Sequence, residues 1–271
     1  MAAIITAEMK KRFIDEFKAD ADSASVRYYI GISRSEDWNT SDTAPDPVNT
    51  EREQRLFRHG LQSVKKVSDY SFVIPRVNWT SGTTYAAYND AVEAHPTVPY
   101  YAMDASNQVY VCLRQGINAA GVAQPSTVAP SGTGNSSFTT ADGYAWKFLY
   151  TVGTLDAAAY KSANFIPIKL QGATDSSSPA TDTQQLAVQN AATAGREIVG
   201  FSLDSGGAGY SSNPTVTING DGTGAAASAV QSGGTIVSLT IDDSASTLKM
   251  GTGYDYASVV LSGGGSPTTI A

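Results

Sequence analysis

The sequence has few of the side chains that build metal sites, disulfides and nucleophilic active sites. Its 271 residues include one cysteine, Cys112, and two histidines, His59 and His95. A single cysteine excludes an intramolecular disulfide, and there is no His-x-x-x-His or Cys-x-x-Cys pair to hold zinc. We therefore expect a protein that uses no cofactor and no metal.

Charge is scarce as well. Charged residues make up 16% of the chain, against ~25% in typical globular proteins. The net charge is −7 and no Lys/Arg cluster offsets it, which argues against binding to nucleic acid. No apolar run approaches the ~18 residues of a membrane helix, and the first residues lack the apolar core of a signal peptide. We expect that the protein does not insert into a membrane and that it assembles in a cytoplasm.

Motifs for catalysis are also missing. No Gly-x-Ser-x-Gly elbow is present to carry a nucleophile. Glu36 and Asp37 are adjacent, so they point in different directions and do not form an acid and base pair across a cleft. Cys112 alternates with Tyr110 in a strand pattern, which is typical of a buried filler. The sequence predicts no catalytic residue and no enzyme.

The composition changes along the chain. Residues 171–271 carry two basic and eight acidic side chains and 16 of the 25 glycines. We predict an α+β N-terminal domain over 1–75, a β-rich middle domain over 76–170, a linker over 171–195 that turns into a short helical or coil segment, and a Gly-rich β-repeat module over 196–271. The predicted fold class is α+β, mainly β, and the final residues leave open a natural chain that extends past 271.

The N-terminal part predicts two helices and two strands. Met9, Phe13 and Phe17 recur at four-residue spacing on one face of the first helix. Thr50 to Glu53 forms a capping box that begins the second. An apolar stripe carries this second helix onward through Leu56, Gly60, Leu61, Val64 and Val67. Strands are expected over 26–32 and 71–75.

The middle part predicts a β-sandwich-like domain. Two alternating runs within 100–113 surround Asp104 to Asn107, which indicates a hairpin with a four-residue turn. Residues 116–138 lack periodicity and are expected to form a long loop. A dense strand follows over 143–152, with one face made of aromatic side chains: Tyr144, Trp146, Phe148 and Tyr150. This face suits either a buried core or a sugar-stacking platform.

The C-terminal part contains an internal repeat. Residues 197–220 match residues 235–263 as a strand, a Gly-rich turn with a tyrosine, and a second strand. The turns are Gly207 to Tyr210 and Gly251 to Tyr254. We therefore expect antiparallel β repeats over 196–271.

Four segments together resemble a known family. They are ISRSEDW at 32–38, VIPRVNW at 73–79, VYVCL at 109–113 and DGYAWKFL at 142–149. In this order and spacing they are similar to the baseplate wedge protein of T-even-type contractile-tailed bacteriophages, the gene-product-eight family. The resemblance covers about residues 1–170 and includes the short strand at 165–168. From about residue 171 the chain departs from the family pattern.

The resemblance implies a structural subunit of the phage tail baseplate, located in the virion. Such a subunit is a homodimer that links neighbouring wedge proteins with the baseplate periphery during assembly and contraction. Its implied partners are other wedge proteins, with tail-fibre attachment proteins as further candidates. The alternative, which depends on the aromatic strand and the glycine loops, is a carbohydrate-binding tail-fibre or adhesin module.

Two strand ends carry the candidate structural corner. One holds Arg34, Glu36 and Trp38, and the other holds Pro75, Arg76 and Trp79. We predict that the two strands end together, with Arg34 or Arg76 paired to Glu36 and the indoles covering the junction between the first two domains. The remaining interface candidates are Tyr144 and Trp146.

Overall fold

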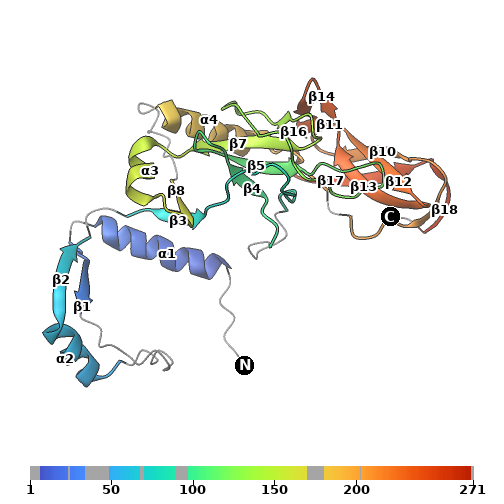
Figure 1. The fold of residues 1–271 in the computed structure, drawn as a ribbon. Coiled ribbons are helices and arrows are strands. Elements are labelled where there is room, and N and C mark those ends of the chain that lie inside the picture. Colours follow the sequence, from blue (N-terminus) through green and yellow to red (C-terminus); the bar gives the residue numbers. More distant parts are fainter. Residues whose placement is uncertain are drawn as a thin grey trace. The chain divides into compact units, whose positions relative to one another are not determined.

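The computed structural model describes residues 7–23, 25–33, 49–67, 70–89, 97–169, 180–201 and 203–269. The chain divides into two compact units, Met1–Tyr70 and Ser71–Ala271. The described residues are mainly β, with four helices and several antiparallel sheets (Figure 1). This agrees with the predicted fold class, while the finer domain boundaries stay predictions.

The N-terminal unit contains helix α1 (Ala7–Asp22), strand β1 (Tyr29–Ser33), helix α2 (Glu51–His59) and strand β2 (Leu61–Lys66). Strands β1 and β2 form an antiparallel pair. The Thr50 half of the capping box is confirmed, since the Thr50 side chain accepts a hydrogen bond from the Glu53 amide at 3.3 Å. No described residue of this unit is buried.

The prediction that the second helix runs on to Val67 is wrong. Helix α2 ends at His59, where Gly60 caps it by donating its amide to the Leu56 carbonyl at 2.9 Å. Leu61 and Val64 belong instead to β2, which pairs with β1. The three- and four-residue spacing of these apolar residues is typical of a helix, which explains the wrong prediction. Glycine weakens a helix, and the residues after Gly60 form hydrogen bonds with β1 instead.

A four-stranded antiparallel sheet forms the centre of the second unit. Its order is β4 (Tyr101–Met103), β5 (Gln108–Arg114), β7 (Ala145–Thr151) and β6 (Phe138–Thr139). The predicted hairpin is confirmed as β4 and β5. Asp104 closes its turn by accepting from the amides of Ser106 and Gln108, and Asn107 takes a positive φ of 61°. Asparagine tolerates this backbone conformation better than most residues do.

The aromatic strand is confirmed as β7, but its alternation breaks before Tyr150. Val109 pairs with Tyr150 and Tyr110 with Phe148, so Leu149 is an extra residue. Such a bulge moves the next side chain to the other face of the sheet. Tyr144, Trp146 and Phe148 share one buried cluster, whereas Tyr150 packs with the cluster on the opposite face. The prediction that all four share a face is therefore wrong for Tyr150.

Short elements flank this sheet. Strands β3 (Phe72–Pro75) and β8 (Phe165–Ile168) pair antiparallel, and helix α3 (Thr154–Tyr160) precedes β8. Helix α4 (Ala180–Gly195) falls within the expected linker and packs along β7. Its Val188 belongs to the same buried cluster as Trp146. Part of the predicted linker is thus a core helix, which low hydrophobic periodicity had obscured.

The C-terminal residues form short antiparallel pairs. The strands are β9 (Ala208–Tyr210), β10 (Thr215–Gly220), β11 (Thr223–Ala225), β12 (Ala227–Ser232), β13 (Thr235–Ile241), β14 (Asp243–Ser244), β15 (Thr247–Leu248), β16 (Met250–Thr252), β17 (Ala257–Ser262) and β18 (Gly265–Thr269). The pairs are β10 with β17, β11 with β16, β12 with β13, β14 with β15 and β9 with β18. The second strands of the two proposed repeats, β10 and β17, pair with each other.

The C-terminal strands are joined to the central sheet. Ile241, Leu248 and Met250 share a buried cluster with Val111 and Leu113 of β5. Three polar contacts add to this. Arg114 binds Asp243 at 3.0 Å and the Ile241 carbonyl at 3.0 Å, and the Leu248 amide donates to Ser137 Oγ at 3.2 Å. The central sheet and the C-terminal strands therefore share one core.

Candidate functional site

The structure brings several of the predicted corner residues into one region. Pro75 ends β3, and Arg76 and Trp79 follow it directly. Tyr144 directly precedes β7, and Trp146 is the second residue of that strand. The remaining corner residues, Arg34, Glu36 and Trp38, lie outside the described residues, so their pairing with Arg76 stays a prediction.

Arg76 binds close to its own strand end. Its amide donates to the Asn164 carbonyl at 2.8 Å, and its guanidinium donates to Asn78 Oδ1 and to the Ser162 carbonyl, both at 2.9 Å. The Pro75 carbonyl accepts from the Tyr101 hydroxyl at 2.6 Å. These contacts fasten the end of β3 to the loop before β8 and to β4.

Trp79 opens a chain of polar contacts that crosses the long loop. Its indole Nε1 donates to Ser126 Oγ at 3.1 Å, and Ser126 in turn donates to Asp142 Oδ2 at 2.9 Å. Ser126 is fully buried. Three segments that are far apart in the sequence are thus joined by two successive hydrogen bonds.

Asp142 is the acceptor at the centre of this corner. Its Oδ2 also accepts from the amides of Thr127 and Val128 at 2.7 and 2.9 Å, and its Oδ1 accepts from Thr140 Oγ1 at 2.5 Å. Burial acts to raise the pKa of Asp142. The hydrogen bonds to the ionised form outweigh it and hold this pKa below its usual range. Asp142 is therefore a charged anchor for the loop.

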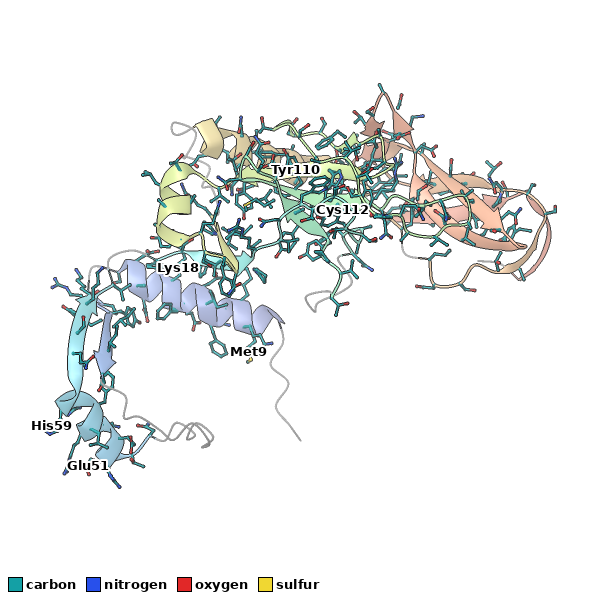
Figure 2. The ribbon with its side chains drawn as sticks, in the orientation of Figure 1. Met9, Lys18, Glu51, His59, Tyr110 and Cys112 are labelled. Atoms are coloured by element: carbon teal, nitrogen blue, oxygen red, sulfur yellow. The ribbon has the colours of Figure 1, made fainter. Side chains whose placement is uncertain are left out.

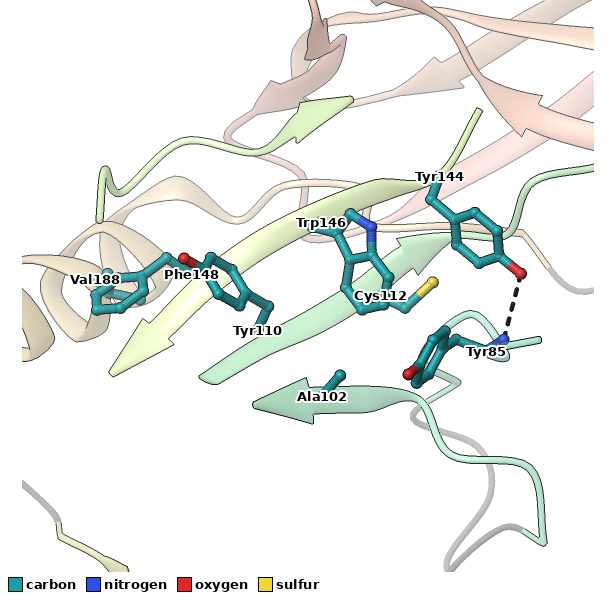
Figure 3. Close-up of a cluster of buried hydrophobic side chains, with 8 residues drawn as sticks. All are labelled: Tyr85, Ala102, Tyr110, Cys112, Tyr144, Trp146, Phe148 and Val188. Carbon is teal, nitrogen blue, oxygen red and sulfur yellow. Dashed lines mark hydrogen bonds between the residues drawn. The ribbon is translucent and has the colours of Figure 1, made fainter. Parts of the chain in front are cut away.

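A buried aromatic cluster lies beside the corner (Figure 3). Tyr144 stacks on Trp146, with ring centroids 5.7 Å apart, and Tyr85 meets Trp146 edge to face at 5.3 Å. The Tyr144 hydroxyl accepts from the Tyr85 amide at 3.3 Å and donates to the Gln124 carbonyl at 2.5 Å. Edge-to-face and offset pairs of this kind stabilise a core beyond simple burial.

Trp146 differs from its neighbours because its polar atom has no partner. The side chain is fully buried, and Nε1 finds no acceptor among the described residues. An orphaned donor of this kind destabilises a fold by roughly 1–3 kcal/mol. The ring therefore contributes through its apolar surface.

Cys112 lies in the same cluster and has low nucleophilic reactivity. Its side chain is fully buried, and Sγ donates to the Arg114 carbonyl at 3.4 Å. Burial raises the pKa of the Cys112 thiol, so the nucleophilic thiolate is disfavoured. The expectation of a filler residue facing the same way as Tyr110 is confirmed, since both belong to this cluster.

A cavity of about 500 Å³ lies between the end of β5 and β13. Its lining mixes apolar side chains such as Leu113 and Phe201 with polar ones such as Gln115. Among the described lining residues the charged one is Arg114, which already binds Asp243 and the Ile241 carbonyl.

The described part of the chain contains neither a metal-binding cluster nor a membrane-spanning helix. No group of three or more His, Cys, Asp and Glu side chains comes together there as a metal site would require. No described helix is both long enough and apolar enough to cross a membrane.

Sequence reasoning missed several members of the corner. Ser126 and Gln124 lie in the long loop without periodicity, and Tyr85 lies before the hairpin in a stretch without a recognised element. The spacing of residues carries no sign that these positions meet across the fold. The motif at 142–149 includes Asp142, but nothing in the sequence indicates the groups that donate hydrogen bonds to it.

No protein-family model matches this sequence, and a search of curated proteins finds no match.

Proposed function

We propose that this protein is a structural subunit of a contractile-phage tail baseplate wedge. It joins neighbouring wedge proteins to the baseplate periphery and acts through binding surfaces without an enzymatic reaction. The ordered motifs at 32–38, 73–79, 109–113 and 142–149 support this proposal. The proposal includes homodimerisation, location in the virion, a β-sandwich-like middle domain and C-terminal β repeats.

The observation that carries the proposal is the apolar surface of the N-terminal unit. Large hydrophobic side chains there are exposed on each described helix and strand and at Val26 between α1 and β1: Met9, Phe13, Ile14, Phe17, Val26, Tyr29, Ile30, Ile32, Leu56, Phe57, Leu61 and Val64. Large exposed apolar surfaces are typical of protein–protein interaction sites, and permanent interfaces are large and apolar. A unit of this kind suits a subunit that is packed between others.

The polar groups of the second unit favour the same reading. Asp142 accepts four hydrogen bonds from the loops around it, and Arg76 binds three groups near its own strand end. Charged groups used in this way hold backbone segments in place. They suit a body that must keep its shape under mechanical load.

The carbohydrate-binding alternative has lost its main support. Tyr144, Trp146 and Phe148 are fully buried, so their faces pack against protein. A sugar-stacking platform requires aromatic faces that are open to solvent.

Chemical cross-linking of intact phage tails, followed by mass spectrometry, tests the proposal. We expect links from Lys65 and Lys66, both exposed on β2 of the N-terminal unit, to other baseplate proteins. Lys161 and Lys169, which lie in the second unit, serve as internal reference positions. Purified tails that lack this chain altogether would contradict the proposal.

A further inference from the structure

Helix α1 presents an apolar face to solvent. Met9, Phe13, Ile14 and Phe17 are 48%, 56%, 48% and 53% exposed. Spacings of three and four residues place them along one side of the helix, and Figure 2 labels Met9 and Lys18 towards its two ends. Phe17 meets the ring of Tyr28 at 5.0 Å and still leaves half of its surface open. This face has the character of a helix that packs against another element.

The charges of α1 run against the polarity of the helix itself. Its first half holds Lys10, Lys11 and Arg12 beside the single acid Glu8, and its second half holds the single base Lys18 among four acids: Asp15, Glu16, Asp20 and Asp22. The last turn has no basic residue. A helix macrodipole favours the reverse arrangement, with acids at the N-terminal end and bases at the C-terminal end.

The ion pairs within α1 follow the same unfavourable order. Lys11 binds Asp15 at 2.8 Å, Arg12 binds Glu16 at 3.2 Å and Lys18 binds Asp22 at 2.8 Å. In each pair the base precedes the acid, which is the weaker orientation for residues four apart. The charge pattern is therefore not optimised for α1 as an isolated helix.

An antiparallel copy of α1 removes this disadvantage. The basic first half of one helix then lies beside the acidic second half of the other, and two-fold symmetry makes the same contact twice. The two macrodipoles also oppose each other. On the apolar face, Phe13 meets its own copy near the axis and Met9 lies opposite Phe17. A parallel copy would instead place like charges together.

We infer that α1 is a homodimerisation surface, in which the face of Met9, Phe13, Ile14 and Phe17 packs antiparallel against the same face of a second copy. This inference deepens the proposed function, because it names the surface through which the proposed homodimer forms. Helix α1 has 16 residues and is about 24 Å long. One face of a helix of this length buries less area than the ~800 Å² per partner of a standard interface. The dimer is therefore expected to be concentration-dependent and to weaken with salt.

Sedimentation of the full chain across low to high micromolar concentrations at low salt tests the dimer. We expect a monomer–dimer equilibrium for the natural sequence and a loss of at least tenfold in dimer affinity for Phe13→Glu. A matched control is Lys65→Glu with Lys66→Glu, which changes two exposed charges of β2 and leaves the equilibrium unchanged. Circular dichroism of each variant checks that helix content is retained.

Charge exchange tests the complementarity directly. One variant carries Lys11→Glu and Arg12→Glu, and the other carries Asp15→Lys and Glu16→Lys. Each variant alone is expected to dimerise at least tenfold more weakly than the natural chain. Mixing the two places an acidic helix beside a basic one, so a heterodimer is expected to form.

Cysteine cross-linking tests the orientation. A Met9→Cys chain is mixed with a Phe17→Cys chain and oxidised, while the buried Cys112 stays out of the reaction. An antiparallel pair yields the mixed disulfide. Disulfides only between like chains would overturn the antiparallel arrangement.

Two results would overturn the dimer surface itself. One is a natural chain that stays monomeric at high micromolar concentration. A monomeric chain whose α1 cross-links to a different protein in tails counts as the same result. The other is a dimer that Phe13→Glu leaves intact. A monomeric chain found in tails overturns this inference and the homodimer included in the proposed function, but it leaves the role as a baseplate subunit standing. An α1 dimer in a protein that is absent from tails supports this inference and contradicts that role.

Discussion

The two units of the chain use apolar side chains in opposite ways. In the N-terminal unit Phe13 and Phe17 lie half exposed on α1, and no described residue is buried. In the second unit Phe148 and Trp146 are fully buried within one continuous aromatic cluster. Burial of apolar surface is the main source of folding free energy. The second unit therefore has a core of its own, while the N-terminal unit has surfaces that suit assembly.

A matched pair of phenylalanine substitutions tests this difference most strongly. Phe148→Ala removes a fully buried ring and is expected to lower the free energy of unfolding by about 3–5 kcal/mol. Phe13→Ala removes an exposed ring and is expected to change it by about 0.5 kcal/mol or less in dilute solution. Urea denaturation followed by circular dichroism measures both. Equal losses would mean that α1 belongs to a core.

Two substitutions of Trp146 separate the contribution of its ring size to stability from the contribution of its polar indole group. We expect Trp146→Ala to cost about 3–5 kcal/mol of unfolding free energy, because it leaves a cavity in the aromatic cluster. Trp146→Phe is expected to cost roughly 1 kcal/mol or less, because it also removes the orphaned indole donor. The two variants are compared by chemical denaturation. A folded and stable Trp146→Ala variant would contradict the assignment of this residue to the core.

Asp142 provides a pH-dependent test of the loop corner. Asp142→Asn is expected to lower the free energy of unfolding by about 2 kcal/mol near neutral pH, because it removes a charge that accepts several hydrogen bonds. The folded pKa of Asp142 lies below its usual value. Its stabilisation is thus fully present above the unfolded pKa of about 3.9 and is lost as pH falls through the folded pKa.

The measurement is the denaturation midpoint of both chains across pH. The gap between the natural chain and Asp142→Asn should stay constant from about pH 5 to 7 and narrow below about pH 4. A gap that widens with acid would show that the carboxyl is held in its neutral form. Asp204→Asn, at an exposed position outside the helices and strands, serves as a control with no expected effect.

Ion pairs give the smallest contrast between the units. Asp243→Ala removes a partner from Arg114, a mostly buried side chain that joins β5 to the C-terminal strands, and is expected to cost roughly 1 kcal/mol. Lys11→Ala breaks an exposed pair on α1 and is expected to cost less than Asp243→Ala, because solvent screens the pair. Thermal unfolding at low and high salt measures both. A larger loss for Lys11→Ala would reverse the comparison.

Local patterns in the sequence predicted the central hairpin and the aromatic strand. The alternation within 100–113 and the turn residues Asp104 and Asn107 specify β4 and β5 without help from distant residues. The same reasoning failed where a nearby alternative competed. The apolar stripe predicted that helix α2 continues past Gly60, but the helix ends there. The bulge at Leu149 moved Tyr150 to the opposite face of the sheet.

The candidate corner was harder to predict because its contacts are non-local. Trp79, Ser126 and Asp142 are each unremarkable in their own segments, and only the fold brings them together. The motif residues Pro75 and Arg76 marked one end of this region. Their proposed partners Arg34, Glu36 and Trp38 stay a prediction.

Amide hydrogen exchange of the dilute full chain, read by mass spectrometry, tests the central difference most directly. We predict strong protection for β5 and β7 and exchange at least a hundredfold faster for α1, β1 and β2, because strands and helices without buried side chains open readily. Comparison with the chain inside assembled tails should show the N-terminal unit gaining protection. Equal protection of both units in the dilute chain would contradict the account.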